Sequence, residues 1–149
     1  MFRRGWRVIL MKGSTMESLE SINALLAPLF PGLMGVQLVE VTPEKVRASL
    51  VVRPDLCTTG DSMHGGAFMA FADTLGGIAT YVNLPPKTRT TTIESSTKFL
   101  RGAPVGSTVH AECTAFHKGR TTMVWQTLMR SADDRLCAVV TQTQLVIPV

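Results

Sequence analysis

The sequence predicts an α+β fold in which a curved antiparallel sheet of about five to six strands wraps around one long central helix. Two observations carry this prediction. The segment 65–82 has helical length and is apolar on nearly every side, so it must be enclosed. Four long segments of alternating polar and apolar residues follow it, joined by short turns. Only the sheet that they form is large enough to enclose the helix.

A first helix is predicted from residue 16 to residue 30. Its apolar residues fall three and four positions apart, which places them on one face: Met16, Leu19, Ile22, Leu25, Leu26, Leu29 and Phe30. Ser14 and Glu17 have the spacing of a capping box, and Pro31-Gly32 ends the helix. Residues 1–13 are expected to be a flexible N-terminal extension, and residues 14–149 a single domain.

Two strands are predicted next, over residues 36–42 and 45–53, with a turn at Pro43-Glu44 between them. In the second strand, Val46, Ala48 and Leu50 alternate with polar residues, which is the period of a half-buried strand. A loop over residues 54–63 leads into the long helix.

The last four strands are predicted at about residues 90–101, 108–117, 121–130 and 136–147. The breaks between them carry turn residues, and connections this short join antiparallel neighbours. Inside the long helix, Gly76 and Gly77 each cost about 1 kcal/mol. Their presence predicts that the sheet approaches the helix backbone closely at both positions.

The composition limits the classes of function that the chain can have. A chain with 45% hydrophobic and 17% charged residues is typical of a compact domain. The net charge is +4, but the basic residues are scattered and aromatic residues make up only 6%, so no nucleic-acid partner is predicted. No segment has transmembrane length, and no membrane partner is predicted. Three widely spaced cysteines without a disulfide pattern favour a cytoplasmic protein.

The stretch MHGGAFMAFADTLGG, residues 63–77, contains the candidate chemistry. Asp73 lies in its most apolar part and has no Lys or Arg at helical spacing. Burying such an acid is costly, which favours a functional carboxylate. A structural aspartate, hydrogen-bonded to a hydroxyl on a strand, is the alternative.

The start of this helix suits an anion. The first amides of a helix have no partner within it, and the helix dipole adds partial positive charge there. Gly65 and Gly66 carry no side chain that would keep a substrate oxygen away. The arrangement suits the oxyanion that forms on an attacked carbonyl. His64 comes directly before these glycines. The alternative to a functional role is that His64 is an ordinary loop residue.

The spacing of the two groups predicts a dimer. Eight residues separate Gly65 from Asp73, so their backbones lie roughly 12 Å apart along the helix axis. An attacked carbonyl must lie about 3 Å from both the amide donor and the acid or its activated water. Two antiparallel copies of the helix meet this demand, with Gly65 of one chain facing Asp73 of the partner subunit. We therefore expect a two-fold dimer with two shared sites.

These residues resemble a known family. HGGAFMAFADT, followed by KFLRGAPVG and HKGRTT, is similar to the PaaI-type thioesterases of the hotdog-fold superfamily, and the similarity runs from about Leu25 to the C-terminus. Its most specific part is the His-Gly-Gly with an acid nine residues after the histidine. The resemblance implies the hotdog fold, homodimers often paired into tetramers, and hydrolysis of acyl-CoA thioesters. It implies no cofactor, since CoA is part of the substrate.

The resemblance also implies roles for individual residues. Asp73 would act as general base on water or as nucleophile. Gly65 would offer its amide to the thioester oxygen, with His64 nearby.

Two further polar positions follow from the resemblance. Family members often carry Asn or a similar polar residue six positions before the histidine. This chain has Thr58 there, so positioning of the water falls to Thr58 or Asp61. A hydroxyl at the start of the strand after the helix matches Thr92, with Thr91 next to it.

The phosphates of CoA need cations, and the candidates are Arg101, Arg120 and Lys118. The two arginines rank above the lysine because a guanidinium matches phosphate geometry better. An apolar pocket for the acyl group is expected from a set of large side chains on the central helix and just before it: Met63, Phe68, Met69, Phe71 and Leu75.

Other functions are compatible with parts of the sequence. A module that binds acyl-CoA without hydrolysing it is the main alternative, because Thr58 departs from the family pattern. A hotdog-type dehydratase would need an acid and a histidine arranged for proton abstraction. The chain has no G-x-S-x-G elbow of a serine hydrolase. His64, His110 and His117 show no metal-ligand spacing, so no metal site is predicted. The acyl group, aromatic or aliphatic, is left open.

Overall fold

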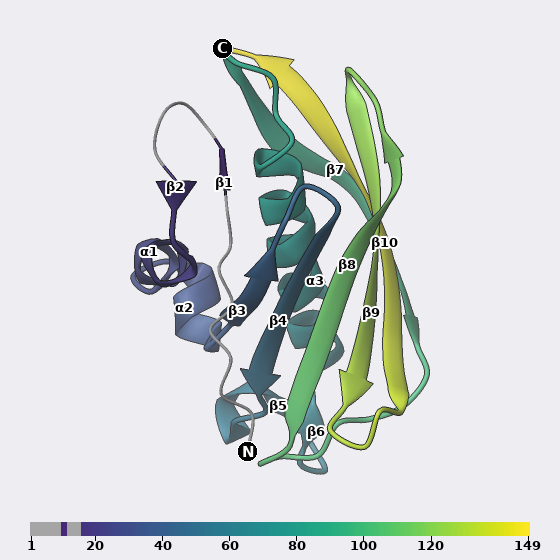
Figure 1. Ribbon diagram of the computed structural model, residues 1–149. Helices are drawn as coiled ribbons and strands as arrows, with labels where there is room; N and C mark the ends of the chain where they lie inside the picture. Colours follow the sequence, from purple (N-terminus) through teal and green to yellow (C-terminus); the bar gives the residue numbers. More distant parts are fainter. Residues whose placement is uncertain (1–9, 12–15) are drawn as a thin grey trace.

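The computed structural model describes residues 10–11 and 16–149. Most of the expected N-terminal extension, with Ser14, lies outside these residues. One six-stranded antiparallel sheet, in the order β3-β4-β8-β9-β10-β7, curves around helix α3 (Figure 1). The predicted fold class is confirmed. The elements of this layer are β3 (Gln37–Val41), β4 (Lys45–Val51), α3 (Gly65–Tyr81), β7 (Thr88–Phe99), β8 (Thr108–Lys118), β9 (Thr122–Ser131) and β10 (Leu136–Pro148).

The first helix differs from its prediction. A short strand pair, β1 (Leu10–Met11) with β2 (Met16–Glu17), comes first, and α1 (Leu19–Leu26) begins only at Ser18. Ser18 caps α1 by accepting the Ser21 N–H at 3.1 Å, so the predicted start of the helix at residue 16 is wrong, while Ser14 of the predicted capping box lies outside the described residues. A second helix, α2 (Phe30–Met34), takes Pro31 into its first turn, where a proline loses no helical hydrogen bond.

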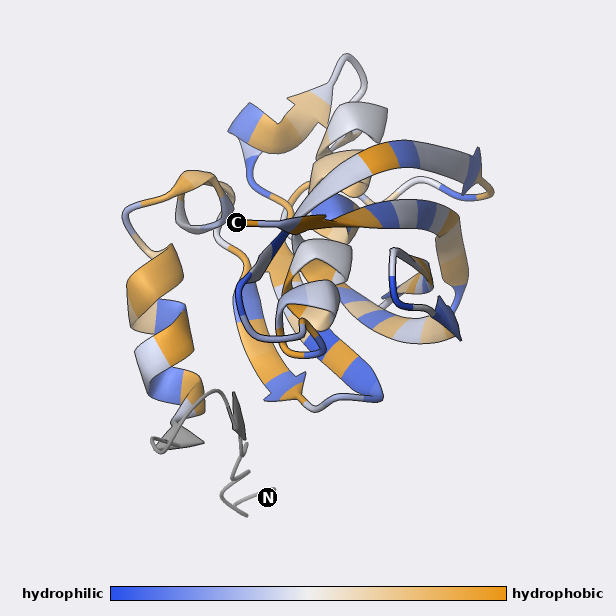
Figure 2. Ribbon diagram, turned by 90° about the horizontal axis from the view of Figure 1, so that it is seen from above, coloured by the Kyte–Doolittle hydropathy of each residue, from blue (hydrophilic) through white to orange (hydrophobic). Residues whose placement is uncertain are grey.

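The strands follow the predicted alternation, seen as orange and blue bands along the sheet in Figure 2. Inward side chains of the strands pack against one side of α3. Phe71 and Leu75 are fully buried there, and each contributes about 1.5–3 kcal/mol by its burial. Trp125 packs below the end of the helix and donates from Nε1 to Thr80 Oγ1 at 2.7 Å. The sheet and α3 therefore share one core.

The other side of α3 is not covered. Gly66, Met69, Asp73 and Tyr81 are exposed, and their spacing of three, four and eight places them on one stripe. The expectation that α3 is enclosed on all sides is therefore wrong for the single chain, and so is the expectation of a buried Asp73. The sheet is too narrow at its β7 edge to reach round the helix.

The two helix glycines have different surroundings. A Cβ at Gly76 would lie 2.3 Å from Gln142 Cδ of β10, so only glycine leaves room for that side chain. A Cβ built at Gly77 would have no neighbouring atom within 4 Å. The predicted close approach of the sheet is confirmed for Gly76 and wrong for Gly77, which opens onto the uncovered side.

Strand β7 forms one edge of the sheet, and within the described part of the chain it pairs only with β10. A bulge at Ile93 interrupts this pairing, because Thr92 lies opposite Gln144 and Glu94 opposite Thr143. The extra residue changes which positions face inward. Thr92 before the bulge and Ser95 after it are both half-buried, on the side of α3.

Short elements complete the chain between β4 and α3. They are the 3-10 turn η1 (Pro54–Leu56), β5 (Cys57–Thr58) and β6 (Ser62–Met63). None of the helices in the described part of the chain has the length and hydrophobicity to cross a membrane.

Candidate active site

The carboxylate of Asp73 is held by two side chains of the sheet. Its Oδ1 accepts a hydrogen bond from Thr92 Oγ1 at 2.6 Å and another from Gln142 Nε2 at 3.2 Å. Its Oδ2 has no hydrogen-bond partner among residues 16–149. The acid is therefore fixed through one oxygen, and the other remains available on the exposed stripe of α3.

A second layer lies behind this contact. Gln144 donates from Nε2 to Thr92 Oγ1 at 2.7 Å and accepts at Oε1 from Thr90 at 2.9 Å. Gln142 and Gln144 are both buried. Sequence reasoning missed both glutamines, although a signal was present: they occupy core-facing positions of β10, in line with Val140 and Val146.

The helix N-terminus is shaped by His64. Its backbone is extended, and its N–H donates to Leu56 O at 2.8 Å. The imidazole Nδ1 accepts the N–H of Gly66 at 2.8 Å, so the neutral ring carries its proton at Nε2. The N–H of Gly65 has no partner among the described residues. Two donors, Gly65 N–H and His64 Nε2–H, thus remain free beside each other in the chain.

Two cavities flank these donors. The larger, of about 510 Å³, contains His64 and Gly66 in its wall, together with apolar side chains of α2, η1 and α3 and the charged pair Arg53 and Asp55. The smaller, of about 330 Å³, lies beside Gly65, Phe99 and Arg101. Of the large side chains expected around the acyl group, Met63 and Phe68 line the smaller cavity. Met69 lies on the exposed stripe, and Phe71 and Leu75 belong to the core.

Arg53 fixes one wall of the larger cavity. Its guanidinium donates to Met34 O at 2.8 Å and to Leu33 O at 2.9 Å, the end of α2, and pairs with Asp55 at 3.0 Å. The hydrogen bond from Arg53 lowers the pKa of the Asp55 carboxyl. Gly35 ends α2 with φ +85°, and a Cβ there would lie 2.7 Å from Arg53 Nη1. Arg53 thus ties the end of α2 to the segment that follows β4.

The three candidate cations do not converge in one chain. Arg101 lies at the end of β7, where its N–H donates to Cys137 O at 3.0 Å. Lys118 and Arg120 lie at the opposite end of the sheet, beside the β8–β9 turn (Figure 1). Arg101 alone shares a cavity with Gly65.

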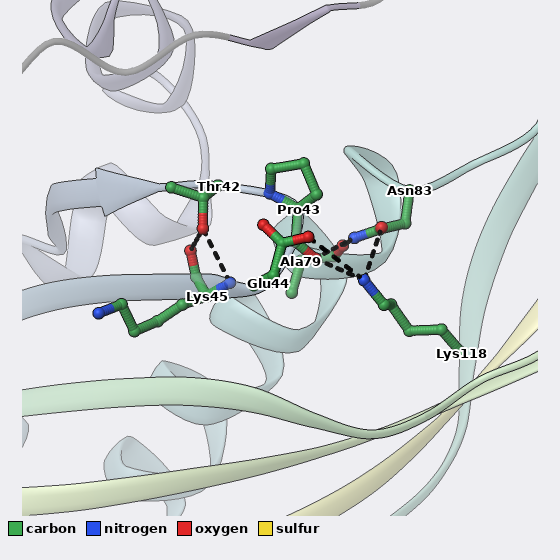
Figure 3. Close-up of polar contacts among 7 residues, drawn as sticks. All are labelled: Thr42, Pro43, Glu44, Lys45, Ala79, Asn83 and Lys118. Carbon is green, nitrogen blue, oxygen red and sulfur yellow. Dashed lines mark hydrogen bonds and ion pairs between the residues drawn. The ribbon is translucent and has the colours of Figure 1, made fainter.

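Figure 3 shows what Lys118 contacts. Its ammonium donates to Pro43 O at 3.2 Å and Asn83 Oδ1 at 3.5 Å, and it lies 3.8 Å from Glu44. Asn83 also donates to Pro43 O at 2.8 Å. Together these contacts connect the β3–β4 turn to the end of α3. Lys118 therefore has a structural role at this end of the sheet.

Thr58 and Asp61 lie in the β5–β6 hairpin. Thr58 is exposed and pairs with Ser62 across it, and Asp61 has a positive φ of 54° in the turn. Neither residue bonds to Asp73 in this chain. A role in positioning water would therefore require a second chain.

Asp73 and Gly65 do not share a site within one chain. They lie eight residues apart on one straight helix, about 12 Å along its axis. Asp73 lines neither of the two cavities described above. One chain presents an acid at one place on α3 and a free amide donor, Gly65 N–H, at the start of the helix. Among the described residues, no three of His, Cys, Asp or Glu gather as a metal site.

Comparison with known proteins yields consistent matches. Residues 60–138 match the family model described as the thioesterase superfamily. The crystal structure of a mutant of thioesterase PA1618 from Pseudomonas aeruginosa has 27% identity and a TM-score of 0.85, over 91% of this chain and 98% of that one. Thioesterase HI1161 from Haemophilus influenzae has 25% identity and a TM-score of 0.84, over 90% and 93%. The 1,4-dihydroxy-2-naphthoyl-CoA hydrolase of Escherichia coli is 24% identical over 80% of this chain and 88% of its own.

Proposed function

The chain belongs to the thioesterase superfamily, and we propose that it hydrolyses an acyl-CoA thioester to the free acid and CoA in a site shared by two copies of the chain. The family resemblance stated from the sequence is confirmed, and with it the hotdog fold and the assignment as a thioester hydrolase. The substrate, the catalytic residues and the dimer are the proposal.

One observation carries the proposal. Among residues 16–149, one oxygen of Asp73 and the amide of Gly65 have no hydrogen-bond partner, and the two lie too far apart along α3 to act on one carbonyl. An antiparallel partner helix places Gly65 against Asp73 of the partner subunit, and the two-fold axis then produces a second, identical site.

The surface around α3 supports a dimer of this form. The exposed stripe continues onto the unpaired edge of β7, and apolar side chains are exposed along both: Met69, Tyr81, Ile93, Phe99 and Leu100. A row of unpaired backbone groups with apolar neighbours favours pairing with another strand. Gly77 leaves space on the same side for a neighbouring helix. Pairing of two dimers, and residence in the cytoplasm, stay predictions.

The reaction needs few groups, because a thioester carbonyl is already electrophilic. In the base route, Asp73 Oδ2 takes a proton from water, and the hydroxide attacks the carbonyl carbon. The Gly65 N–H, with the helix dipole behind it, stabilises the oxyanion. The C–S bond then breaks, and the CoA sulfur leaves as a thiolate or takes the proton from Asp73. The products are one acid and one thiol for each water consumed.

The same oxygen serves the nucleophilic route. Asp73 Oδ2 then attacks the carbonyl itself, CoA thiolate leaves, and water hydrolyses the mixed anhydride. A single turnover in ¹⁸O-water identifies the nucleophilic route when water attacks the carboxyl carbon of Asp73 in the anhydride. If hydrolysis of the anhydride returns water oxygen to the carboxylate, Asp73 gains mass; in the base route it does not.

In this proposal, the two cavities bind different parts of the substrate. The larger one has the size of a small-molecule site, and its mostly apolar wall from α2 and α3 suits an acyl group. Arg101 lines the smaller one together with Gly65 and suits a phosphate of CoA. The E. coli relative is named for a bicyclic aromatic acyl-CoA, so aromatic CoA esters are tested beside medium-chain aliphatic ones.

The test is thiol release from a panel of acyl-CoA esters by wild type, Asp73→Asn and a matched Asp134→Asn control. Asp134 lies in the β9–β10 turn, where asparagine keeps its positive φ of 62°. We expect wild-type and control turnover to agree, and Asp73→Asn to lose at least about a thousandfold in kcat while remaining folded. Wild-type turnover in Asp73→Asn would refute the mechanism. Tight binding without thiol release by wild type would favour a binding module.

A further inference from the structure

We propose that Gln144 is a positioning residue for this reaction: it directs the hydroxyl proton of Thr92 onto Asp73 Oδ1 and thereby leaves Oδ2 as the reacting oxygen. The role rests on the proposed function of Asp73, and nothing in the family resemblance assigns it. It is derived from four hydrogen bonds that link β7, β10 and α3.

The direction of the chain of bonds follows from its chemistry. Thr92 Oγ1 lies 2.6 Å from Asp73 Oδ1 and 2.7 Å from Gln144 Nε2. An amide NH₂ can only donate, and an ionised carboxylate can only accept. The hydroxyl oxygen therefore accepts from Gln144, and its single proton goes to Asp73.

The orientation of the glutamine is itself fixed. Thr90 Oγ1 donates to Gln144 Oε1 at 2.9 Å, which turns Nε2 toward Thr92. Gln144 is only 1% exposed, so water does not compete for either end of its amide. Burying a glutamine is costly unless both ends are bonded, and here both are. Without Gln144, the Thr92 hydroxyl would be free to rotate away from the acid.

The two oxygens of Asp73 become unequal as a result. Oδ1 accepts from Thr92 and from Gln142, whereas Oδ2 has no partner among residues 16–149. The two hydrogen bonds occupy the lone pairs of Oδ1 that a proton or a carbonyl carbon would otherwise use. Proton abstraction or attack therefore falls to Oδ2, whose direction is set by the two bonds on Oδ1.

Gln142 and Gln144 differ in a way that an experiment can use. Gln142 donates to the acid directly, at 3.2 Å. Gln144 reaches the acid only through the hydroxyl of Thr92. Removal of that hydroxyl should therefore abolish the effect of Gln144 and leave the contribution of Gln142.

The experiment is a double-mutant cycle on kcat and KM with Gln144→Met and Thr92→Val, using the acyl-CoA ester that wild type hydrolyses fastest. We expect each single variant to lose about tenfold in kcat, with KM changed less than about threefold. The double variant should lie within about twofold of Thr92→Val alone, because the two residues act as one unit. Gln126→Met, the same exchange on the outer face of β9, is the control and should keep wild-type kcat.

Gln144→Glu is the second variant, for the case that Gln144→Met does not fold. It keeps the shape but offers an acceptor, so two carboxylates compete for one proton of Thr92, and we again expect a loss of kcat. Wild-type kcat in a folded Gln144 variant, or losses that multiply in the double variant, would overturn the proposal. Asp73→Asn is measured alongside. If it stays active, the proposed function itself fails; if it is inactive while Gln144→Met is fully active, only the role of Gln144 fails.

Discussion

His64 Nδ1 accepts the backbone N–H of Gly66 at 2.8 Å, while the N–H of Gly65, one residue earlier, has no partner in the described part of the chain. The side chain of the capping residue satisfies the second amide of α3 and leaves the first one free. The cap also holds the imidazole in place, with Nε2–H as a further donor. The start of α3 is thus prepared for an external acceptor.

Gly65→Pro tests the free amide directly. Proline lacks the N–H, and it is well tolerated at the first position of a helix. The preceding His64 has φ −63° and ψ 141°, values that a residue before proline adopts readily. We expect kcat to fall by about a hundred- to a thousandfold, the effect of losing one oxyanion donor.

Gly65→Ala is the matched control, since it retains the N–H. Its Cβ would lie 3.1 Å from the Phe99 ring, which has to shift by a few tenths of an ångström. We expect a loss of less than about tenfold. Equal losses in the two variants would show that the side chain, and not the amide, matters at this position.

Arg53→Met should loosen α2. The variant removes two hydrogen bonds to the carbonyls of Leu33 and Met34, which lowers the free energy of unfolding by about 1–3 kcal/mol. Because α2 forms a wall of the larger cavity, KM for the acyl-CoA should rise more than kcat falls. Arg47→Met, which removes only surface ion pairs, should change stability by less than about 1 kcal/mol in the same denaturant titration. Equal stability of the two variants would contradict the role of Arg53.

The stability of the fold should decline at alkaline pH through Cys113. Burial raises the pKa of its thiol from the ordinary 9.0 to about 12. Between these values the unfolded chain has lost a proton that the folded chain keeps, so the free energy of unfolding falls as pH rises, by up to about 1.4 kcal/mol per pH unit. Below pH 9 the thiol keeps its proton in both the folded and the unfolded chain, so Cys113 does not make the stability depend on pH there. Denaturant titrations at pH 8 and pH 10 should show a larger loss for wild type than for Cys113→Ala, and equal losses would contradict the burial effect.

Much of the fold could be predicted from the sequence, because its signals are local. The alternation in β4 and in the last four strands, with short turns between them, predicted the antiparallel sheet. The first helix was mispredicted because Leu25, Leu29 and Phe30 keep a helical spacing although they remain exposed. Periodicity does not show that the chain ends one helix at Leu26 and begins another at Phe30.

The site was only partly predictable. Asp73, Gly65 and His64 are neighbours in sequence, so helix geometry related them. Thr92 came from the resemblance, and the structure places it at 2.6 Å from the acid. Gln142 and Gln144 are about 70 residues from Asp73 along the chain, and only the register of β10 against β7 brings them there. The exposure of Asp73 depends on how far the sheet extends around α3. No local sequence pattern predicts that extent.

The central claim is that the acid of one subunit and the amide of its partner act on one carbonyl. The most direct measurement mixes two inactive variants, Asp73→Asn and Gly65→Pro, after unfolding and refolding them together. A hybrid dimer then contains one intact site out of two, and random pairing makes half of the dimers hybrids. The account predicts that about a quarter of wild-type thiol release returns in the mixture, while each variant refolded alone stays inactive. If no activity returns in dimers shown by mass spectrometry to be mixed, the two groups do not act across the interface, and the account is wrong.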